Sequence, residues 1–167
     1  LRRLAGLTED LLEVSRMDAG RAVVVPSRID LVDLLAEVVD DAGGAEIAIA
    51  APAVLEVTTD PARLRVVVRN LLANAVQHGA PPVDVTVDRA AADVVLSVRD
   101  AGPGVPAELR DRVFDRFVRG DEARHGSSSG LGLAIARENA RLLGGSLSLL
   151  PDGRTFVLQL PDLADQG

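Results

Sequence analysis

Two asparagines, Asn70 and Asn74, have the residue type and spacing that ligand binding could use in this 167-residue chain. On a helix of about 3.6 residues per turn they share one face with Gln77 and His78, while aliphatic side chains cover the opposite side. An amide buried without a partner is costly, so these side chains either hydrogen-bond to nearby backbone or line a ligand pocket. In a pocket, their carbonyl oxygens would suit a hard cation such as Mg²⁺. The stretch by itself leaves both interpretations open.

Two glycine-rich segments lie further along the chain. Asp100-x-Gly102-x-Gly104 directly follows a strand-like run, so it predicts a sharp turn that either is an ordinary tight turn or leaves room for a close neighbour. Gly130-x-Gly132 opens a second predicted helix. Glycines at a helix start expose backbone N–H groups and the positive end of the helix dipole, and both favour a phosphate.

Composition excludes several classes of partner. The net charge of −7 repels phosphate backbones, and three aromatic residues, all Phe, leave little surface for stacking bases, so nucleic acid is not expected to bind. The absence of cysteine excludes disulfides and thiolate metal sites and permits a reducing cytoplasm. No apolar run approaches the roughly 20 residues of a membrane span, so we expect no membrane contact by this chain.

The first 20 residues must be positioned by something outside their own helix. Leu4, Leu7, Leu11 and Val14 step by three and four, which predicts a bundle or coiled-coil helix ending near Gly20. Such a helix is marginal alone, so its apolar seam must meet another helix, in this chain or in a symmetry mate. Because the chain begins within this pattern and without Met, we interpret it as a fragment of a longer protein.

The remaining sequence predicts alternating helices and strands. Residues 22–25 are β-prone and end at Pro26, which allows a short edge strand at most. Asp30 and Asp60-Pro61 have the form of helix starts. Strands are expected at 46–50, 54–58, 83–88, 94–99, 146–150 and 155–160, and helices at 31–42, 61–78, 106–112 and 131–143, with a mobile loop at 120–129.

Four segments stand in a fixed order: Asn70-x-x-x-Asn74, Asp100-x-Gly102-x-Gly104, Phe114-x-x-Phe117-x-Arg119 and Gly130-x-Gly132-Leu133. Together they resemble the N box, first glycine box, F box and second glycine box of bacterial sensor histidine kinases. The resemblance implies the Bergerat fold, an α/β two-layer sandwich (α+β) with a mixed sheet of about five strands under three helices. It also implies that 1–20 end the dimerisation and phosphoacceptor hairpin, 21–29 form a linker, 30–162 form the ATP-binding domain and 163–167 form a tail.

The same resemblance assigns a role to each motif in binding ATP and Mg²⁺. Asp100 would accept a hydrogen bond from the adenine amino group, and Gly102 and Gly104 would let the base lie close. Asn74 would hold Mg²⁺, with Asn70 beside it as a second metal ligand. Asn70, Asn74 and Arg119 would be the catalytic residues.

The phosphates are assigned to the second glycine box and its surroundings. Arg119 would add charge near the lid, and Gln77 and His78 would border the nucleotide, although His78 is equally explained as a half-exposed helix terminus. The backbone N–H groups that would cradle the phosphates are those of Gly130, Leu131, Gly132 and Leu133. The activity implied is transfer of the ATP γ-phosphoryl group to a histidine on the hairpin, for relay to a response regulator, by a homodimeric parent protein that is anchored in the membrane with this part in the cytoplasm.

Three positions depart from the family pattern. Gln77 stands where a Lys or Arg often reaches the phosphates, Val66 replaces a frequent Gln, and Ser128 replaces the first glycine of the second glycine box. A nucleotide-binding signalling module with little kinase activity therefore stays open as an alternative. An ATP-hydrolysing member of the same fold is the other alternative, but such enzymes place a carboxylate base where this chain has Asn70.

Overall fold

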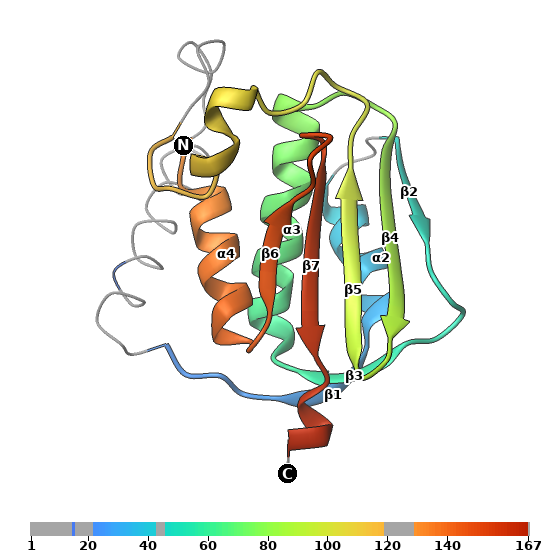
Figure 1. The fold of residues 1–167 in the computed structure, drawn as a ribbon. Coiled ribbons are helices and arrows are strands. Elements are labelled where there is room, and N and C mark those ends of the chain that lie inside the picture. Colours follow the sequence, from blue (N-terminus) through green and yellow to red (C-terminus); the bar gives the residue numbers. More distant parts are fainter. Residues whose placement is uncertain (1–14, 16–21, 43–45, 119–128, 167) are drawn as a thin grey trace.

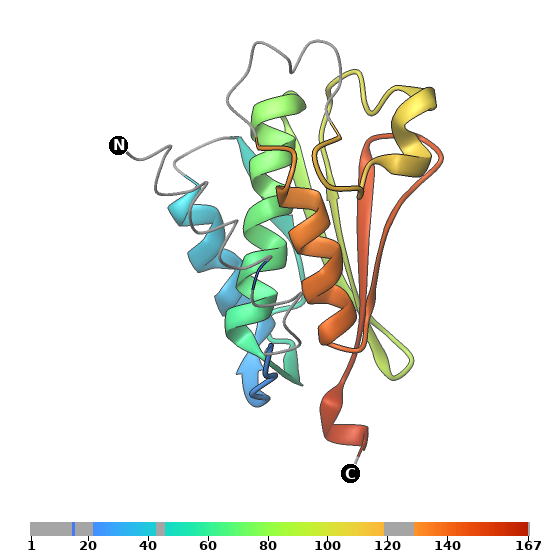
Figure 2. The same ribbon diagram turned by 90° about the vertical axis from the view of Figure 1, so that its left-hand side faces the viewer.

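The computed structural model describes residues 15, 22–42, 46–118 and 129–166, which form two layers. Figures 1 and 2 show one layer of strands and, on one of its faces, a layer of helices. The helices of the described part are α2 (Leu31–Asp41), α3 (Pro61–His78) and α4 (Gly132–Leu142), with the short 3₁₀ helices η1 (Ala107–Arg112) and η3 (Leu163–Gln166). The strands are β1 (Ser27–Asp30), β2 (Ile47–Ala50), β3 (Glu56–Thr59), β4 (Val83–Ala90), β5 (Asp93–Arg99), β6 (Ser146–Leu149) and β7 (Thr155–Pro161).

The main sheet is mixed and has five strands in the order β2-β4-β5-β7-β6. β2 runs parallel to β4, and every other neighbouring pair is antiparallel. The expected fold, a mixed five-stranded sheet under three helices, is therefore confirmed. Apart from residue 15, the expected helical stub before residue 21 lies outside the described residues, and so does the expected lid loop apart from residue 129.

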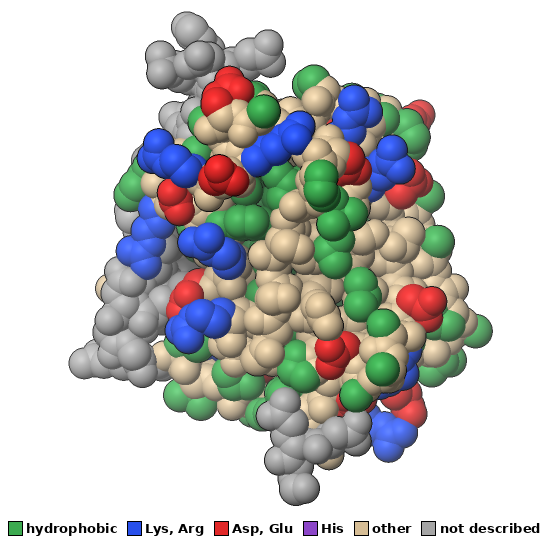
Figure 3. Space-filling view, viewed as in Figure 1, with side chains coloured by type: hydrophobic (Ala, Val, Ile, Leu, Met, Phe, Trp, Pro, Cys, Tyr) green, Lys and Arg blue, Asp and Glu red, His purple; other side chains and the backbone are tan. Residues whose placement is uncertain are grey.

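Alternation along the strands explains why helices cover only one face. In β4, Val83, Val85 and Val87 are buried while the residues between them are exposed, the pattern of a sheet with one solvated face. The open face carries polar contacts, such as the 2.6 Å bond between the hydroxyls of Thr86 and Ser97. Figure 3 shows this face, with charged side chains gathered mainly toward its margin.

The helix α3 is the centre of the helical layer. Asp60 caps it by accepting hydrogen bonds from the N–H groups of Ala62 and Arg63 at 3.0 and 3.2 Å, and Pro61 fits the first turn. Each fully buried aliphatic side chain on its inner face contributes about 1.5–3 kcal/mol. These side chains are Leu64, Val67, Val68, Leu71 and Leu72, and they fix which face of α3 is left for Asn70 and Asn74.

The chain before α2 differs from the expectation. The edge strand predicted at 22–25 is wrong: the strand β1 begins only at Ser27, after Pro26, and pairs with β3 in a separate two-stranded ribbon. The backbone before Pro26 bonds to side chains instead, since the N–H of Val25 donates to Asp60. Among the described residues, no helix is both long enough and apolar enough to cross a membrane.

Candidate functional site

Asn70 lies where α3 meets the start of α4. Its amide nitrogen donates to the carbonyl of Val66 at 2.9 Å, so backbone bonding accounts for one half of the side chain. Its Oδ1 accepts no hydrogen bond from any described residue. A Cβ on Gly132 would come within 2.8 Å of this oxygen, so glycine lets the two helices approach here. The backbone interpretation thus holds for the amide nitrogen, while the pocket interpretation stays a prediction for the amide oxygen.

The other polar residues of α3 extend toward its C-terminus. Asn74 is half-buried and has no hydrogen bond to a described residue, whereas Gln77 and His78 are exposed. The structure therefore brings Asn70 and Asn74 together on the side of α3 that faces α4 and leaves Gln77 and His78 at the solvent edge. Neither edge residue supplies the permanent cation that the family pattern would put at position 77.

Asp100 directly follows β5 and is only 6% exposed. Its Oδ1 accepts a hydrogen bond from the N–H of Gly102 at 2.7 Å, while Oδ2 accepts none from the part of the chain that the structure describes. A buried carboxylate oxygen without a donor is costly, so it requires a partner. This orphaned oxygen is the strongest indication of a ligand in the described residues.

The C-terminus of α3 closes tightly around Asp100. A Cβ at Gly79 would lie 2.3 Å from the Cγ atom of Asp100, and the N–H of Ala101 donates to the carbonyl of Ala80 at 2.9 Å. Gly79 is a site residue that the motif analysis missed. Its signal was present in the sequence, since a glycine directly after a helix is a common way to end it.

The glycines of the first glycine box are explained by contacts within the protein. A Cβ on Gly102 would lie 2.8 Å from Oδ1 of Asp100, and one on Gly104 would lie 2.9 Å from Cγ of Arg154. Gly104 also has a φ of +81°, which other residues rarely adopt. Both glycines are therefore required by the turn itself, and closeness to a base stays a prediction.

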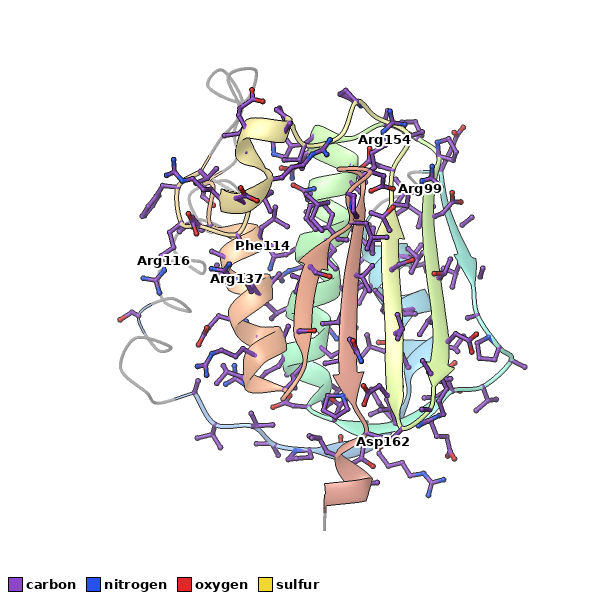
Figure 4. All side chains as sticks on the ribbon, in the orientation of Figure 1. Arg99, Phe114, Arg116, Arg137, Arg154 and Asp162 are labelled. Carbon is purple, nitrogen blue, oxygen red and sulfur yellow. The ribbon has the colours of Figure 1, made fainter. Side chains whose placement is uncertain are left out.

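The F box packs one phenylalanine inward and leaves the other outside. Phe114 is buried edge-on against Phe156, with ring centroids 6.0 Å apart, and the guanidinium of Arg137 lies 5.4 Å from its ring centroid. Figure 4 shows Phe114 and Arg137 beside one another near α4. Phe117 is exposed and has a φ of +65°, and its N–H donates to the carbonyl of Gly130 at 2.8 Å. The F box is thereby tied to the second glycine box, while Arg119 lies outside the described residues.

The second glycine box leads into α4 without a side-chain cap. Gly130 has a φ of +71°, and the N–H of Leu131 donates to the hydroxyl of Ser129 at 3.2 Å. The side chain of Leu131 is buried and that of Leu133 packs against the core, so only their backbone groups are left for a ligand. The first turn at Gly132 has no side-chain cap and is compatible with an anion, and phosphate binding there stays a prediction.

Two further features bound the chemistry. The described residues contain no group of three or more His, Cys, Asp or Glu side chains that could hold a metal ion. A hollow of about 560 Å³ lies elsewhere, lined by β3, Arg28, Arg89 and Asp162. Figure 4 places Asp162 at the opposite end of the sheet from Arg99, the residue before Asp100, so this hollow is separate from the motifs.

The charges around that hollow are already paired. Arg89 lies 3.2 Å from the carboxylate of Asp162, and Arg28 forms an ion pair with Glu56. Burial opposes ionisation of Asp162, but the N–H groups of Thr58 and Ala164 and the Arg89 guanidinium lower the pKa of its carboxyl below the ordinary value. This end of the molecule is held together by these contacts and shares no residue with the motif site.

Comparison with known proteins identifies the family. Residues 59–164 match the model of the histidine kinase-, DNA gyrase B-, and HSP90-like ATPases. The signal transduction histidine-protein kinase AfsQ2 of Streptomyces coelicolor is 41% identical over 165 residues, which cover 96% of this chain and 31% of AfsQ2. The chain thus spans about a third of the length of the curated relatives it matches.

Solved structures agree. The ATP-binding domain of PrrB from Mycobacterium tuberculosis superposes with a TM-score of 0.63 at 33% identity, covering 82% of this chain and 97% of that domain. Full-length ShkA in complex with AMPPNP superposes with a TM-score of 0.80 at 28% identity, covering 95% of this chain and 35% of ShkA. The resemblance inferred from the four motifs is confirmed: the chain belongs to the histidine kinase-, DNA gyrase B- and HSP90-like ATPase family and is a homologue of the sensor histidine kinases.

Proposed function

We propose that this chain is the ATP-binding catalytic part of a two-component sensor histidine kinase. The observation that carries the proposal is the buried carboxylate of Asp100, which keeps one oxygen without a donor among the described residues. An adenine amino group can donate to this oxygen, whereas guanine offers a carbonyl oxygen of like polarity at the corresponding position. The donor set therefore fits an adenine nucleotide.

The residues beside Asp100 also fit the phosphates and a metal ion. The amide oxygen of Asn70 accepts no hydrogen bond from a described residue and Asn74 is half-buried without a described partner, so both can offer oxygen ligands to Mg²⁺. The backbone N–H groups from Gly130 to Leu133 and the uncapped start of α4 suit phosphate oxygens. Arg119 is proposed to add positive charge. Bound Mg²⁺ would supply neutralisation of the phosphate charge, on which phosphoryl transfer largely depends.

The chemistry of Asn70 favours phosphoryl transfer to a histidine over hydrolysis. A hydrolase of this fold needs a general base for water, and an amide cannot accept that proton. The Asn70 side chain is also held by Val66, so its nitrogen is committed to the backbone. These contacts support a role for Asn70 in holding the metal and the nucleotide, with the phosphoryl acceptor supplied by another element.

We propose that this acceptor is a histidine on a dimerisation hairpin, with relay to a response regulator and a homodimeric parent protein. The parent is proposed to be membrane-anchored, with this part in the cytoplasm. Support comes from the names of the relatives, which include a signal transduction histidine-protein kinase and a probable sensor histidine kinase. The two histidines of this chain, His78 and His125, are not proposed as acceptors, because His78 lies on the nucleotide-binding helix itself and His125 has no acidic neighbour directly after it.

The experiment separates binding from transfer. The chain is incubated with γ-labelled ATP and Mg²⁺, alone and with a supplied hairpin that carries an acceptor histidine. We expect label on the hairpin, acid-labile and base-stable, and none on this chain. Label on His78 or His125 would contradict the assignment of the acceptor. Release of free phosphate without labelled hairpin would contradict the kinase in favour of a hydrolase.

A further inference from the structure

One fully buried polar side chain takes no part in the proposed nucleotide site. Asn139, on α4, has no exposed surface. Its amide nitrogen donates to the carbonyl of Ile135 at 3.0 Å, and its Oδ1 accepts from Nη1 of Arg63 at 2.9 Å. A leucine, whose side chain has the same branched arrangement of heavy atoms, would avoid the cost of burying an amide, so cohesion of the helices alone does not explain the asparagine.

Arg63 reaches from Asn139 to the chain that precedes β1. Its Nε and Nη2 atoms donate to the carbonyl oxygen of Val23 at 3.0 and 2.8 Å. Asp60 completes the arrangement, since its Oδ2 accepts from the N–H of Val25 at 2.9 Å. The side chains of Arg63 and Asp60 are only 14% and 7% exposed and lie 3.8 Å apart, so the two charges support each other in a largely dry position.

The segment held in this way, residues 22–26, is termed the leading segment. The side chains of Val23 and Val25 are 70% and 66% exposed, so burial of these side chains does not hold the segment in place. Its backbone is instead held by hydrogen bonds to Arg63 of α3 and to Asp60, the N-cap residue of that helix. Of the three valines, only Val24 packs against the core. Directional hydrogen bonds fix a path in a way that apolar contact does not.

The contacts that hold the leading segment and the proposed nucleotide site lie on the same pair of helices. Arg63 and Asn70 are seven residues apart on α3, and so are Gly132 and Asn139 on α4, which is about 10.5 Å of helix in each case. The helices thus meet at two levels, one beside the proposed phosphate site and one at the leading segment. Because the leading segment is fixed to these helices, it has a defined direction relative to the proposed phosphate site.

We propose that Asp60, Arg63 and Asn139 form an anchor that sets the path of the leading segment, and so sets the direction from which the preceding part of the protein approaches the nucleotide. The direction of approach to the nucleotide rests on the proposed function, whereas the path of the leading segment does not. These three are positioning residues, because none of them lies among the groups assigned to the nucleotide. Asn139 orients Arg63, and Arg63 and Asp60 hold the backbone.

The absence of cysteine makes the anchor directly testable. Cysteines introduced at the exposed positions Val23 and Asp88 can carry spin labels on the leading segment and on the sheet. In the otherwise unchanged chain we expect a narrow distribution of distances between the labels. Asn139→Leu and Arg63→Met should broaden it, and in unlabelled protein should speed exchange of the Val25 amide hydrogen by about 10-fold.

The matched control is Arg65→Met, which removes an exposed arginine of the same helix that pairs with Glu37 at 2.7 Å. This variant should leave both readouts unchanged. Equal distributions and equal exchange in Asn139→Leu, Arg63→Met and the control would overturn the anchor. The anchor would also be overturned if the variants that broaden the distance distribution lost affinity for an ATP analogue as well, because that would indicate general disruption of α3 and α4.

A final arm separates the anchor from the kinase proposal. With the hairpin supplied as a separate molecule, the path of the leading segment no longer matters, so all variants should label it at rates within about twofold of the unchanged chain. Loss of trans-labelling confined to the anchor variants would contradict the anchor's independence from the nucleotide site. If the unchanged chain labels no hairpin, the proposed function fails, while the distance and exchange measurements still decide the anchor.

Discussion

Replacing Asp100 by asparagine changes one atom at the proposed base site and almost nothing else. Oδ1 would still accept from the N–H of Gly102, as it does now at 2.7 Å. The position of Oδ2, the oxygen without a described donor, would then carry an NH₂ group. Because the substitution preserves volume, the close contacts of Asp100 with Gly79 should survive.

The magnitude follows from the loss of one charge-assisted hydrogen bond in a buried place. A hydrogen bond to a charged group is worth about 1.5–3 kcal/mol, and Asp100, at 6% exposure, is largely shielded from water. Asp100→Asn should therefore weaken adenosine and ADP binding by about 10- to 150-fold. The new NH₂ group can donate to a guanine carbonyl, so the affinity for GDP should rise while that for ADP falls. The ratio of ADP to GDP affinity should therefore fall by a larger factor than the ADP affinity itself.

Calorimetry with ADP and GDP, without added metal, measures this effect apart from the metal site. Asp84→Asn is the matched control, because it removes the same charge from an exposed position at the start of β4 and should leave both affinities unchanged. Thermal unfolding of Asp100→Asn checks that the fold persists. Equal affinity of the unchanged chain for ADP and GDP, or unchanged ADP affinity in Asp100→Asn, would refute the assignment.

Three further changes test other parts of the structure. Gly132→Ala should alter stability by less than about 1 kcal/mol, because its Cβ meets only the movable end of Asn70, yet it should lower Mg²⁺-dependent nucleotide affinity about 10-fold, measured by titration with and without metal. Leu71→Ala, in the fully buried face of α3, should cost about 2–5 kcal/mol in urea unfolding, and a loss below about 1 kcal/mol would contradict the packing. The hydroxyl of Thr155 and neighbouring N–H groups lower the pKa of the Asp152 carboxyl. Its contribution to stability is therefore present above the unfolded-state value of about 3.9 and is lost progressively as the pH falls from there through the lowered folded-state pKa. Asp152→Asn should therefore flatten the acid side of the stability curve, and identical acid unfolding in the two proteins would count against that contribution.

Sequence predicted the elements wherever local chemistry decides the structure. Asp60-Pro61 and the aliphatic spacing after them locate α3 almost to the residue, because cap, proline and apolar face agree. The two hairpins follow equally from strand-like runs around short turns. The strand predicted at 22–25 failed because its backbone partners are the side chains of Asp60 and Arg63, which lie far along the chain. A local pattern cannot indicate such contacts.

The candidate site divides in the same way. The motif after a strand singled out Asp100, but its burial and its oxygen without a described donor depend on how Gly79 and Gly102 close around it. The amide nitrogen of Asn70 bonds to Val66, while its oxygen has no described donor. This difference could be seen only once the packing of α3 against α4 was known. Asn139 gave no signal in the sequence, because a buried asparagine in a helix is indistinguishable from an exposed one until its neighbours are known.

The parallel pairing of β2 with β4 also has a consequence for the order of folding. The antiparallel pairs β4–β5 and β6–β7 close through short turns, whereas β2 can pair only after the crossover that contains α3 has been placed. In Figure 1, β2 lies at the edge of the sheet, and it is only four residues long. It should join the sheet late and detach first, leaving a transient free edge on β4. The partly folded chain, more than the native one, would then be the species prone to strand exchange between copies.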